Sequence, residues 1–448
     1  MVGTLVALVL LVAGSSGASP TSGTASATGT SGSAPRSASA PASTPASTPA
    51  SAPAAAPAAA LSTASTSVPT PPLQLTRVGF PGKPSALIAL SSRTWVVAVD
   101  HQLFRTTDGG ANWQPLLGHC AKSQRAGSPC GNTVTGFAAL GPTLVAVAAG
   151  LADVWRSGDG GRTWHQVLLP APVVDGAWSA EGRLWLATQP GSSTTHPLRT
   201  PVSIEASAGG QRWSVLGRVP PEQGGYVNFA GVQVLGDGEW SAGYWDGDCT
   251  IPAGLAFSTD EGRSWKTVPS PSPHGEVLGA LGRRLLFAVP PCIVTAPPVL
   301  QGLFESSDAG SSWQAARLVA GSGPLLPGEV HMRTLQGEAS RSQPSQGSAA
   351  SGSGTEVSVD AIATAGARSA VAVGGYGTYR YSPGGFVQPA SMRTLVLVTS
   401  DGGATWRLDS LPSGPELDVV SCASPRFCIA GSSTSTVGVV LVPGAGKT

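Results

Sequence analysis

Two aspartates of this sequence lie within apolar stretches, and their carboxyl groups are candidates for acid–base catalysis. Asp175 lies in the segment PVVDGAW and Asp360 in VSVDAIA, and both segments have the composition of strands. Two carboxyl groups roughly 5 to 9.5 Å apart across a cleft can hydrolyse a glycosidic bond, with one group acting as the acid. The alternative is a solvated carboxylate with a structural role. We favour that alternative, and Asp175 and Asp360 remain the only catalytic candidates.

A second set of residues could bind a ligand, because it combines aromatic rings with a few polar groups. It includes all five tyrosines of the chain, in Gly-rich segments such as YWDGDC and GYGTYRYSPGG that we interpret as long loops. Aromatic and polar side chains on long loops are typical of surfaces that bind peptides or glycans. Tyrosines that only cap the apolar ends of neighbouring strands are the alternative. The candidate ligand-binding residues are Tyr226, Tyr244, Trp245, Asp246, Tyr376, Tyr379, Arg380 and Tyr381.

One repeated pattern organises the elements that must position these residues. The pattern is Ser/Thr-x-Asp-x-Gly-x-Ser/Thr-Trp, and repeats of about 50 residues indicate an array of similar structural units. Complete copies run over Thr106–Trp113, Ser157–Trp164, Ser258–Trp265, Ser306–Trp313 and Thr399–Trp406, and a decayed copy ends at Trp213. The six tryptophans lie 51, 49, 52, 48 and 93 residues apart. We interpret the long interval as containing a disordered insertion, Gln336–Thr355.

The pattern has a physical reason in turn chemistry. The Asp carboxylate accepts hydrogen bonds from backbone N–H groups of a tight turn, and Gly adopts backbone angles that other residues resist. The tryptophan then begins the next strand and packs between neighbouring sheets. We therefore expect structural roles for Asp108, Trp113, Asp159, Trp164, Trp213, Asp260, Trp265, Asp308, Trp313, Asp401 and Trp406. A calcium role is the weaker alternative, since each turn offers one or two carboxylates and calcium takes six to eight oxygens.

This array resembles the Asp-box, or BNR-repeat, β-propellers of sialidases, sortilin-like receptors, xyloglucan hydrolases and photosystem II assembly factors. The resemblance covers about Leu73 to Pro443 and implies an all-β fold with four strands in each repeat. Three strands follow the last copy, and the segment Leu73–Phe80 supplies a fourth. We therefore predict a seven-bladed β-propeller, closed by the N-terminal strand pairing into the last blade, which leaves no open sheet edge at the closure.

The resemblance also predicts on which face a site would lie. In a blade, the turn between the third and fourth strands carries the Asp-box, so these Asp residues ring one face. The loops between the second and third strands lie on the other face, and four of them are long. These loops are Gln189–Pro201, Tyr244–Pro252, Pro290–Gln301 and Gly375–Ser391. We expect the candidate ligand-binding residues on this rim, opposite the Asp-boxes.

A sialidase-like enzyme would need an arginine cluster, a tyrosine nucleophile partnered by Glu, and an acid/base Asp. The Arg-Ile-Pro motif that accompanies the first of those arginines is absent, and several arginines lie in or beside the Asp-box turns. Fold alone does not decide function. We therefore predict a non-catalytic module that binds a protein or a glycan and needs no cofactor. A glycoside hydrolase, sialidase-like or xyloglucanase-like, is the alternative.

The amino-acid composition limits the classes of partner that we expect. The 448 residues carry 26 Lys and Arg against 25 Asp and Glu, for a net charge of +1, with no basic run. Nucleic acid is therefore not an expected partner, because phosphate binding needs a concentrated basic patch. No CxxC motif is present and the histidines do not cluster beside cysteines, so we expect no metal. We expect the protein to act as a monomer with an extracellular protein or glycan partner.

The first part of the sequence predicts export. Residues 1–18 combine an apolar run with small residues, as in a signal peptide or a membrane anchor. Residues 19–72 are mostly Ala, Ser, Pro and Thr, which predicts a disordered linker. The β-propeller is then expected to occupy residues 73–448. The protein would be secreted or tethered to the cell surface.

Six cysteines, an even number, fit an oxidising compartment. Their positions suggest the pairs Cys120–Cys130, Cys249–Cys292 and Cys422–Cys428. The last pair flanks a predicted β-hairpin. Free buried thiols are the alternative.

Overall fold

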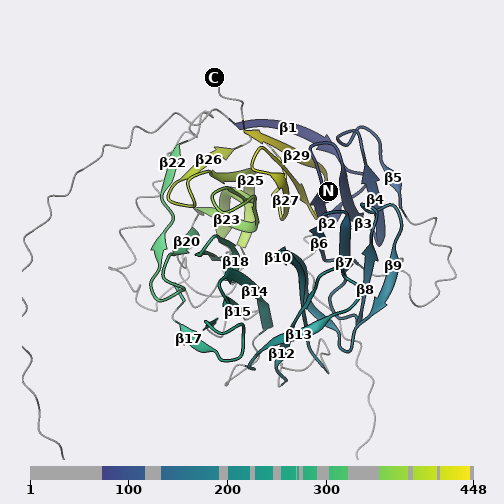
Figure 1. The fold of residues 1–448 in the computed structure, drawn as a ribbon. Coiled ribbons are helices and arrows are strands. Elements are labelled where there is room, and N and C mark those ends of the chain that lie inside the picture. Colours follow the sequence, from purple (N-terminus) through teal and green to yellow (C-terminus); the bar gives the residue numbers. More distant parts are fainter. Residues whose placement is uncertain are drawn as a thin grey trace, which may run out of the picture. The chain divides into compact units, whose positions relative to one another are not determined.

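The structure, a computed structural model, is a ring of β-sheets (Figure 1). It describes residues 73–116, 133–190, 200–221, 228–245, 254–268, 270–271, 276–289, 302–320, 353–381, 387–410 and 414–443. All of them belong to one compact unit, Val68–Thr448. All the secondary-structure elements within these residues are β-strands.

The strands form seven sheets, and each sheet is one blade of the ring. In chain order, the first two blades are β2 (Pro84–Ala89), β3 (Trp95–Val99), β4 (Gln102–Thr106) and β5 (Gln114–Pro115), then β6 (Gly136–Leu140), β7 (Thr143–Val147), β8 (Asp153–Ser157) and β9 (His165–Leu168). Blades three and four are β10 (Val173–Ala180), β11 (Arg183–Thr188), β12 (Val202–Ser207) and β13 (Ser214–Val219), then β14 (Asn228–Gly236), β15 (Glu239–Trp245), β16 (Leu255–Ser258) and β17 (Lys266–Val268).

The remaining blades depart from this regular order. Blade five is β18 (Glu276–Leu281), β19 (Arg284–Val289), β20 (Gly302–Ser306) and β21 (Gln314–Ala315). Blade six has five strands: β22 (Leu318–Ala320), β23 (Ser353–Thr364), β24 (Ala370–Tyr381), β25 (Val387–Thr399) and β26 (Trp406–Ser410). Blade seven combines β27 (Val419–Ser424), β28 (Phe427–Ser432) and β29 (Ser435–Pro443) with β1 (Leu73–Gly79).

The ring confirms the predicted all-β, seven-bladed β-propeller. The innermost strands are β2, β6, β10, β14, β18, β23 and β27, and each contacts the innermost strand of the next blade (Figure 1). In blade seven, β1 pairs antiparallel with β29 from Leu73↔Pro443 to Gly79↔Val437. The first and last described strands of the chain therefore lie side by side.

The hydrophobic core lies between the blades. Each of seven clusters of buried side chains joins two adjacent blades, and together they run around the whole ring. At the contact of blades three and four, for example, Trp185 meets Trp240 edge to face, with ring centroids 5.3 Å apart, and both are 1 % exposed. Apolar burial between sheets is thus the main source of stability.

The eight-residue repeats form hydrogen-bonded turns, here called the box turns, between the third and fourth strands of their blades. In blade four the Ser258 hydroxyl accepts a hydrogen bond from the Gly262 amide at 2.8 Å and donates to Asp260 Oδ1 at 2.8 Å. The same carboxylate accepts from the amide and the hydroxyl of Ser264, at 2.8 and 2.6 Å. The other four complete repeats make the same bonds, with Asn112 Nδ2 in place of the last hydroxyl in blade one.

The box turns lie on the same face as the turns between first and second strands. The Gly109 amide donates to the Arg93 carbonyl at 3.0 Å, and Gly402 donates to Arg368 at 2.9 Å, which joins the two kinds of turn. Equivalent bonds occur in blades two and four. The box tryptophans reach the preceding blade, since Trp113 Nε1 donates to the Gly79 carbonyl at 3.1 Å.

Two features of blade six differ from the sequence prediction. Strand β23 begins at Ser353, so the last three residues of the predicted insertion 336–355 belong to a strand, and the rest lies outside the described residues. The strand β22, which was not predicted, pairs in parallel with β26 from Leu318↔Trp406 to Ala320↔Leu408. Residues 353–355 and strand β22 are fixed by pairing with distant partners.

Of the three predicted cysteine pairs, Cys422 and Cys428 form a disulfide between directly opposed residues of β27 and β28. The pairs Cys120–Cys130 and Cys249–Cys292 lie outside the described residues, as do the predicted leader and linker.

Candidate functional site

In blade six, three strands continue past the end of the outer ladder, in the direction away from the box turn. Its outermost ladder ends where Ser410 of β26 pairs with Leu395 of β25. Beyond that point β23, β24 and β25 continue as a three-stranded antiparallel sheet over residues 353–358, 375–381 and 387–394. We call these three segments the arm.

The arm corrects one sequence prediction. Segment Gly375–Ser391 was expected to be a loop, but residues up to Tyr381 belong to β24 and residues from Val387 belong to β25. Glycines at 374, 375 and 377 suggested a loop, whereas pairing on both sides holds the segment as a central strand.

Four of the candidate ligand-binding residues lie on the arm. They are Tyr376, Tyr379, Arg380 and Tyr381, all on β24. In the register, Tyr376 is opposite Val357 and Arg393, and Tyr379 is opposite Gly354 and Pro389. The arm therefore brings together the part of the tyrosine set that is close in sequence.

The other four candidates are only partly described. Tyr244 and Trp245 are the last two residues of β15, the second strand of blade four, where the chain leaves that blade on the arm's face. Tyr226 and Asp246 lie outside the described residues.

The two catalytic candidates lie on innermost strands of different blades. Asp175 is on β10 of blade three, within an irregularity of the pairing between Val173 and Ala177. Asp360 is on β23 of blade six, at a β-bulge between Val359 and Ala361. A bulge redirects the local chain and is frequent beside functional sites.

Asp360 meets a carboxyl group from the neighbouring blade. Its side chain forms a hydrogen bond with the side chain of Glu416, in the segment that leads from blade six into blade seven. Asp418 follows two residues later and also acts on Glu416 electrostatically. We call Asp360, Glu416 and Asp418 the carboxyl cluster, and residues 414–418 the connector.

Further hydrogen bonds hold the connector against both blades. Thr394 Oγ1, at the root of the arm, donates to the Pro415 carbonyl at 2.7 Å, and the Leu417 amide donates to the Gly374 carbonyl at 3.2 Å. Leu417 is fully buried in the core cluster shared by blades six and seven. On the blade-seven side, Asp418 Oδ1 accepts from the Ser433 amide at 2.8 Å. The carboxyl cluster thus lies where the arm joins the ring.

The surroundings favour the protonated forms of Glu416 and Asp418. Burial raises the pKa of Glu416, and the nearby negative charge of Asp418 raises it further, while the hydrogen bond with Asp360 acts in the opposite direction. Burial also raises the pKa of Asp418, against hydrogen bonds from Ser433 that lower it.

Sequence analysis missed Glu416 and Asp418. They flank the buried Leu417 in the segment PELDVV, directly before an innermost strand. An acid–apolar–acid alternation at the start of such a strand places two carboxyl groups on the side opposite the core, and this signal could have found them. Their contact with Asp360 depends on how blades six and seven pack.

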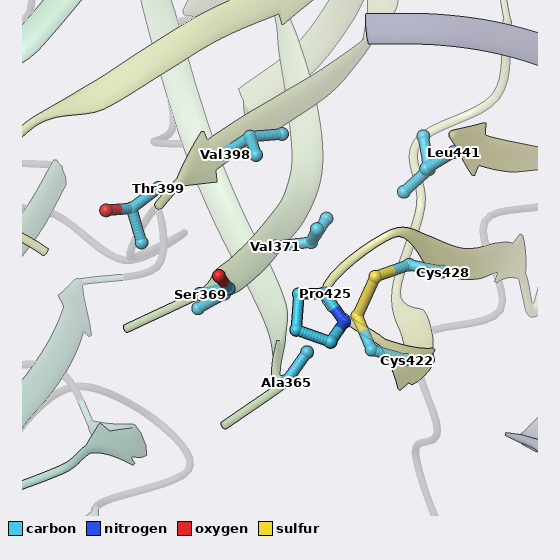
Figure 2. A pocket seen from close by; sticks show the side chains of 10 residues that line it. Ala365, Ser369, Val371, Val398, Thr399, Cys422, Pro425, Cys428 and Leu441 are labelled. Carbon is cyan, nitrogen blue, oxygen red and sulfur yellow. A yellow bond between two sulfur atoms is a disulfide. The ribbon is translucent and has the colours of Figure 1, made fainter. Parts of the chain in front are cut away.

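A small pocket lies on the other face, beside the disulfide (Figure 2). Its lining is mostly apolar and includes Ala365, Val371, Pro425 and Leu441, with hydroxyl groups from Ser369 and Thr399. No group that titrates near neutral pH lines it, because Cys422 and Cys428 are oxidised to the disulfide. This pocket therefore offers no acid–base chemistry.

Metal and membrane features were sought in the same part of the chain. Within the described residues, no three or more His, Cys, Asp or Glu side chains are grouped so that they could hold a metal ion. No helix among these residues is long and apolar enough to cross a bilayer.

Comparison with known proteins finds a relative by sequence. The chain is 28 % identical over 203 residues to the photosystem II assembly lipoprotein Ycf48 of Synechococcus sp. (strain CC9902). The match covers 39 % of this chain, and the chain spans 58 % of the length of that relative. No family model matches the chain.

Several solved structures are similar over most of this chain. One is Ycf48 bound to D1 peptide, with 14 % identity, a TM-score of 0.49, and coverage of 84 % of this chain and 97 % of that one. Ycf48 from Cyanidioschyzon merolae has 13 % identity, a TM-score of 0.47 and coverage of 82 % and 98 %. The GH74 enzyme of Niastella koreensis has 12 % identity, a TM-score of 0.49 and coverage of 82 % and 53 %.

Proposed function

We propose that this chain, similar over part of its length to a photosystem II assembly lipoprotein, is a non-catalytic module that binds a protein partner. The proposed binding surface is the rim opposite the box turns, centred on the arm of blade six. Tyr376, Tyr379, Arg380 and Tyr381 are the proposed contacts, and Tyr244 and Trp245 of blade four extend the surface.

The arm is the single observation that supports this surface best. Strands β23, β24 and β25 have 12, 12 and 13 residues, whereas most strands of the other blades have two to seven. An antiparallel extension of this kind is costly to retain unless it is used, because its faces and edges add surface that the ring does not need. Tyrosine provides large contact area with little loss of side-chain freedom on binding.

The relative supports a protein partner over a glycan. Its name describes an assembly factor and a lipoprotein, and assembly work requires contact with other polypeptides. Export with an N-terminal signal peptide or membrane anchor is part of the same proposal. A glycan ligand on the same rim would use the same tyrosines, since aromatic rings also stack on sugars.

The geometry of the acids does not favour the hydrolase alternative. The neighbour that acts on Asp360 is Glu416, in the segment that leads into blade seven, and not Asp175. Asp175 lies on the innermost strand of blade three, three blades away in the ring. If purified protein released reducing sugars from a glycan panel and Asp360→Asn abolished the release, the hydrolase would replace the binding module.

The binding surface is testable by site-specific photo-crosslinking in the organism that produces the protein. A photoreactive phenylalanine analogue at Tyr379 is expected to capture a discrete protein partner. The matched control places the analogue at Arg93, an exposed residue of a turn on the box-turn face. Excess unlabelled wild-type propeller should compete with the capture, and a competitor carrying Tyr376→Ala, Tyr379→Ala and Tyr381→Ala should not. Capture from Arg93 alone, or equal competition by both proteins, would overturn the assignment of the surface.

A further inference from the structure

The turns between first and second strands form an inner ring on the box-turn face, and charge is unevenly distributed around this ring. In blades six, seven and one, each of these turns carries one arginine and no acid. The three arginines are Arg368, Arg426 and Arg93, and all three residues are exposed. We call them the arginine arc.

The turns of blades six and seven meet at the small pocket beside the disulfide. Ser369, next to Arg368, and Pro425, next to Arg426, both line this pocket (Figure 2). The Ala365 amide donates to the Ser369 carbonyl at 2.7 Å, which closes the turn that carries Arg368. Two arginines of the arc therefore come from turns in contact.

An aromatic contact joins the turns of blades seven and one. Phe427, the residue after Arg426, stacks on Trp95 with ring centroids 5.9 Å apart. Trp95 follows Arg93 by two residues, and its Nε1 donates to the Ser91 carbonyl of the same turn at 3.2 Å. The three arginines thus lie on three successive turns that are held to one another.

The charges of the arc are not neutralised within the part of the chain that the structure describes. None of the ion pairs formed there includes an arginine of the arc. The adjacent box turns contain Asp108 and Asp401, whose carboxylates accept hydrogen bonds inside their own turns, for example from Asn112 and Thr405. The guanidinium N–H groups of the arc are therefore available to an external anion.

On the other side of the ring, acids offset the arginines. In blade three, Glu181 and Arg183 flank the same turn. Between blades four and five, Arg283 pairs with Asp237 at 3.6 Å and also with Glu239. The unbalanced positive charge of the inner ring therefore lies in blades six, seven and one.

The chain also enters the ring at the arc. Blade seven has no box turn, and its third and fourth strands end instead at the pair Leu73↔Pro443. The chain that precedes β1 therefore joins the ring on the box-turn face, in the middle blade of the arc. A membrane anchor before Leu73, which is part of the function proposed above, would bring this face toward a bilayer.

We infer that the arginine arc docks the box-turn face on an anionic membrane surface by binding lipid phosphate groups. A guanidinium group binds phosphate through two parallel N–H···O bonds. A membrane offers many phosphates in one plane, so turns from three blades can reach it together without a matching groove. The arm, on the opposite face, then points away from the membrane and stays accessible to a protein partner.

Binding of the full-length protein to lipid vesicles tests the docking. Co-sedimentation compares vesicles of phosphatidylcholine alone with vesicles that contain about one-third phosphatidylglycerol. The ratio of the two apparent affinities removes the contribution of an anchor, because an anchor acts on both. The anionic vesicles should be preferred by about fivefold for each arginine, or roughly 100-fold in total. High salt should remove the preference, because it screens the charges.

Two triple variants of the arc separate charge from folding. Arg93→Gln, Arg368→Gln and Arg426→Gln together should abolish the preference for anionic vesicles. Replacement of the same three residues by lysine keeps the charge and should retain the preference within about fivefold. Equal loss in the lysine variant would indicate damage to the fold and would overturn the inference, as would an unchanged preference in the glutamine variant.

A matched control changes three other exposed arginines of the same face. Arg162→Gln, Arg212→Gln and Arg263→Gln, in the turns that follow the third strands of blades two, three and four, remove the same charge. This variant should keep the preference within about threefold. A loss equal to that of the arc variant would show that net charge, and not the arc, attracts the membrane, and would overturn the inference.

An acidic protein is the other class of partner that arginines could bind. Polyglutamate is the probe for it. Binding of polyglutamate through the arc without any preference for anionic vesicles would overturn the membrane assignment. The inference takes only the anchor from the proposed function, and the crosslinking test from Tyr379 concerns the opposite face. Failed crosslinking with a positive vesicle test would leave the arc standing and remove the proposed binding surface, whereas the reverse result would overturn the arc alone.

Discussion

The aspartates of the box turns act within their own turns. The amide and side chain of Asn112 lower the pKa of Asp108 to about 2, and the side chain and amide of Ser264 do the same for Asp260. The turn of blade five lowers the pKa of Asp308 to about 2 in the same way. Each carboxylate stabilises a turn only in its charged form, so these residues link the stability of the turns to pH.

Acid should therefore weaken the fold within a defined window. Because the folded pKa lies below the ordinary value of 3.8, the contribution of the box aspartates is complete above about pH 4 and is lost as pH falls toward about 2. Asp260→Asn should lower the urea midpoint at pH 6 and should flatten its fall between pH 4 and pH 2. Urea titrations of both proteins across this range measure the difference. An unchanged slope in the variant would contradict this role for Asp260.

A second residue-scale feature is the position that follows each box aspartate. It has a left-handed backbone in all five complete repeats, with φ of 59° at Ala309 and 80° at Gly402. Only glycine adopts this conformation without a steric penalty of about 1 to 2 kcal/mol.

Replacing alanine by glycine at this position, and glycine by alanine, should change the free energy of unfolding in opposite directions. Ala309→Gly is expected to raise the free energy of unfolding by about 1 kcal/mol, and Gly402→Ala to lower it by about as much. No atom lies within 4 Å of the Cβ added at Gly402, so the backbone alone decides the result. Chemical denaturation of both variants measures the effect, and shifts of the same sign would refute the explanation.

At the scale of elements, β1 and β22 show how strands outside the regular repeat are used. Strand β1 fills the outermost place of blade seven and pairs with β29 over seven residues. Strand β22 covers the outer edge of β26 in parallel, and the Trp406 amide donates to the Arg317 carbonyl at 2.8 Å beside it. Both place hydrogen-bond partners on edges that would otherwise attract other chains.

Removal of β1 should expose such an edge. Deletion of residues 1–79 is expected to lower Tm and to cause self-association, because β29 loses its partner strand. Deletion of residues 1–67, which leaves the compact unit intact, is the control and should preserve both properties. Calorimetry and light scattering after size exclusion report the two effects. A monomeric 80–448 protein with unchanged Tm would show that β1 does not close the ring.

The disulfide within blade seven should make a modest contribution. It links Cys422 and Cys428 across a sequence separation of 6 residues, and so short a loop restricts the unfolded chain by about 2 kcal/mol. Cys422→Ala with Cys428→Ala should therefore lower the free energy of unfolding by about 2 kcal/mol without loss of the fold. The same loss should follow reduction of the wild type by dithiothreitol, and a much larger loss in either case would indicate a wider role.

At the scale of the whole molecule, the hydrophobic core is divided among the interfaces between blades. Buried apolar side chains form interfaces between successive blades, and these interfaces close on themselves through blades seven and one, where Trp95 stacks on Phe427 at 5.9 Å. A closed chain of interfaces has no terminal blade from which unfolding can begin, so we expect cooperative unfolding.

A large cavity at one interface tests this cooperativity. Trp240→Ala removes a side chain that is 1 % exposed and packs on Trp185 and Trp265, at a cost of about 3 to 5 kcal/mol. Calorimetry should show one transition at lower temperature. The control Val215→Ala, at a side chain that is 46 % exposed, should change stability by less than about 0.5 kcal/mol. A separate early transition would mean that blades three and four unfold on their own.

The sequence by itself determined what is local. The box pattern holds its Ser or Thr, Asp, Gly and Trp within eight residues, so the turn and its spacing predict the repeated blade without knowledge of distant contacts. Apolar strands between the turns, such as Trp95–Val99, follow from the same local pattern. The number of blades then follows from counting the predicted strands, with the segment that begins at Leu73 as the fourth strand of the last blade.

Only the tertiary structure decided which distant segments meet. The stretch after Gly374 contains glycines, which are depleted in strands, but partners on both sides make it a central strand of the arm. The contact of Asp360 with Glu416 joins residues of two blades, and no spacing in the sequence fixes it. Strand pairing and blade packing are long-range interactions whose register depends on the whole ring. The box turns could therefore be predicted from the sequence, and the meeting of Asp360 with Glu416 could not.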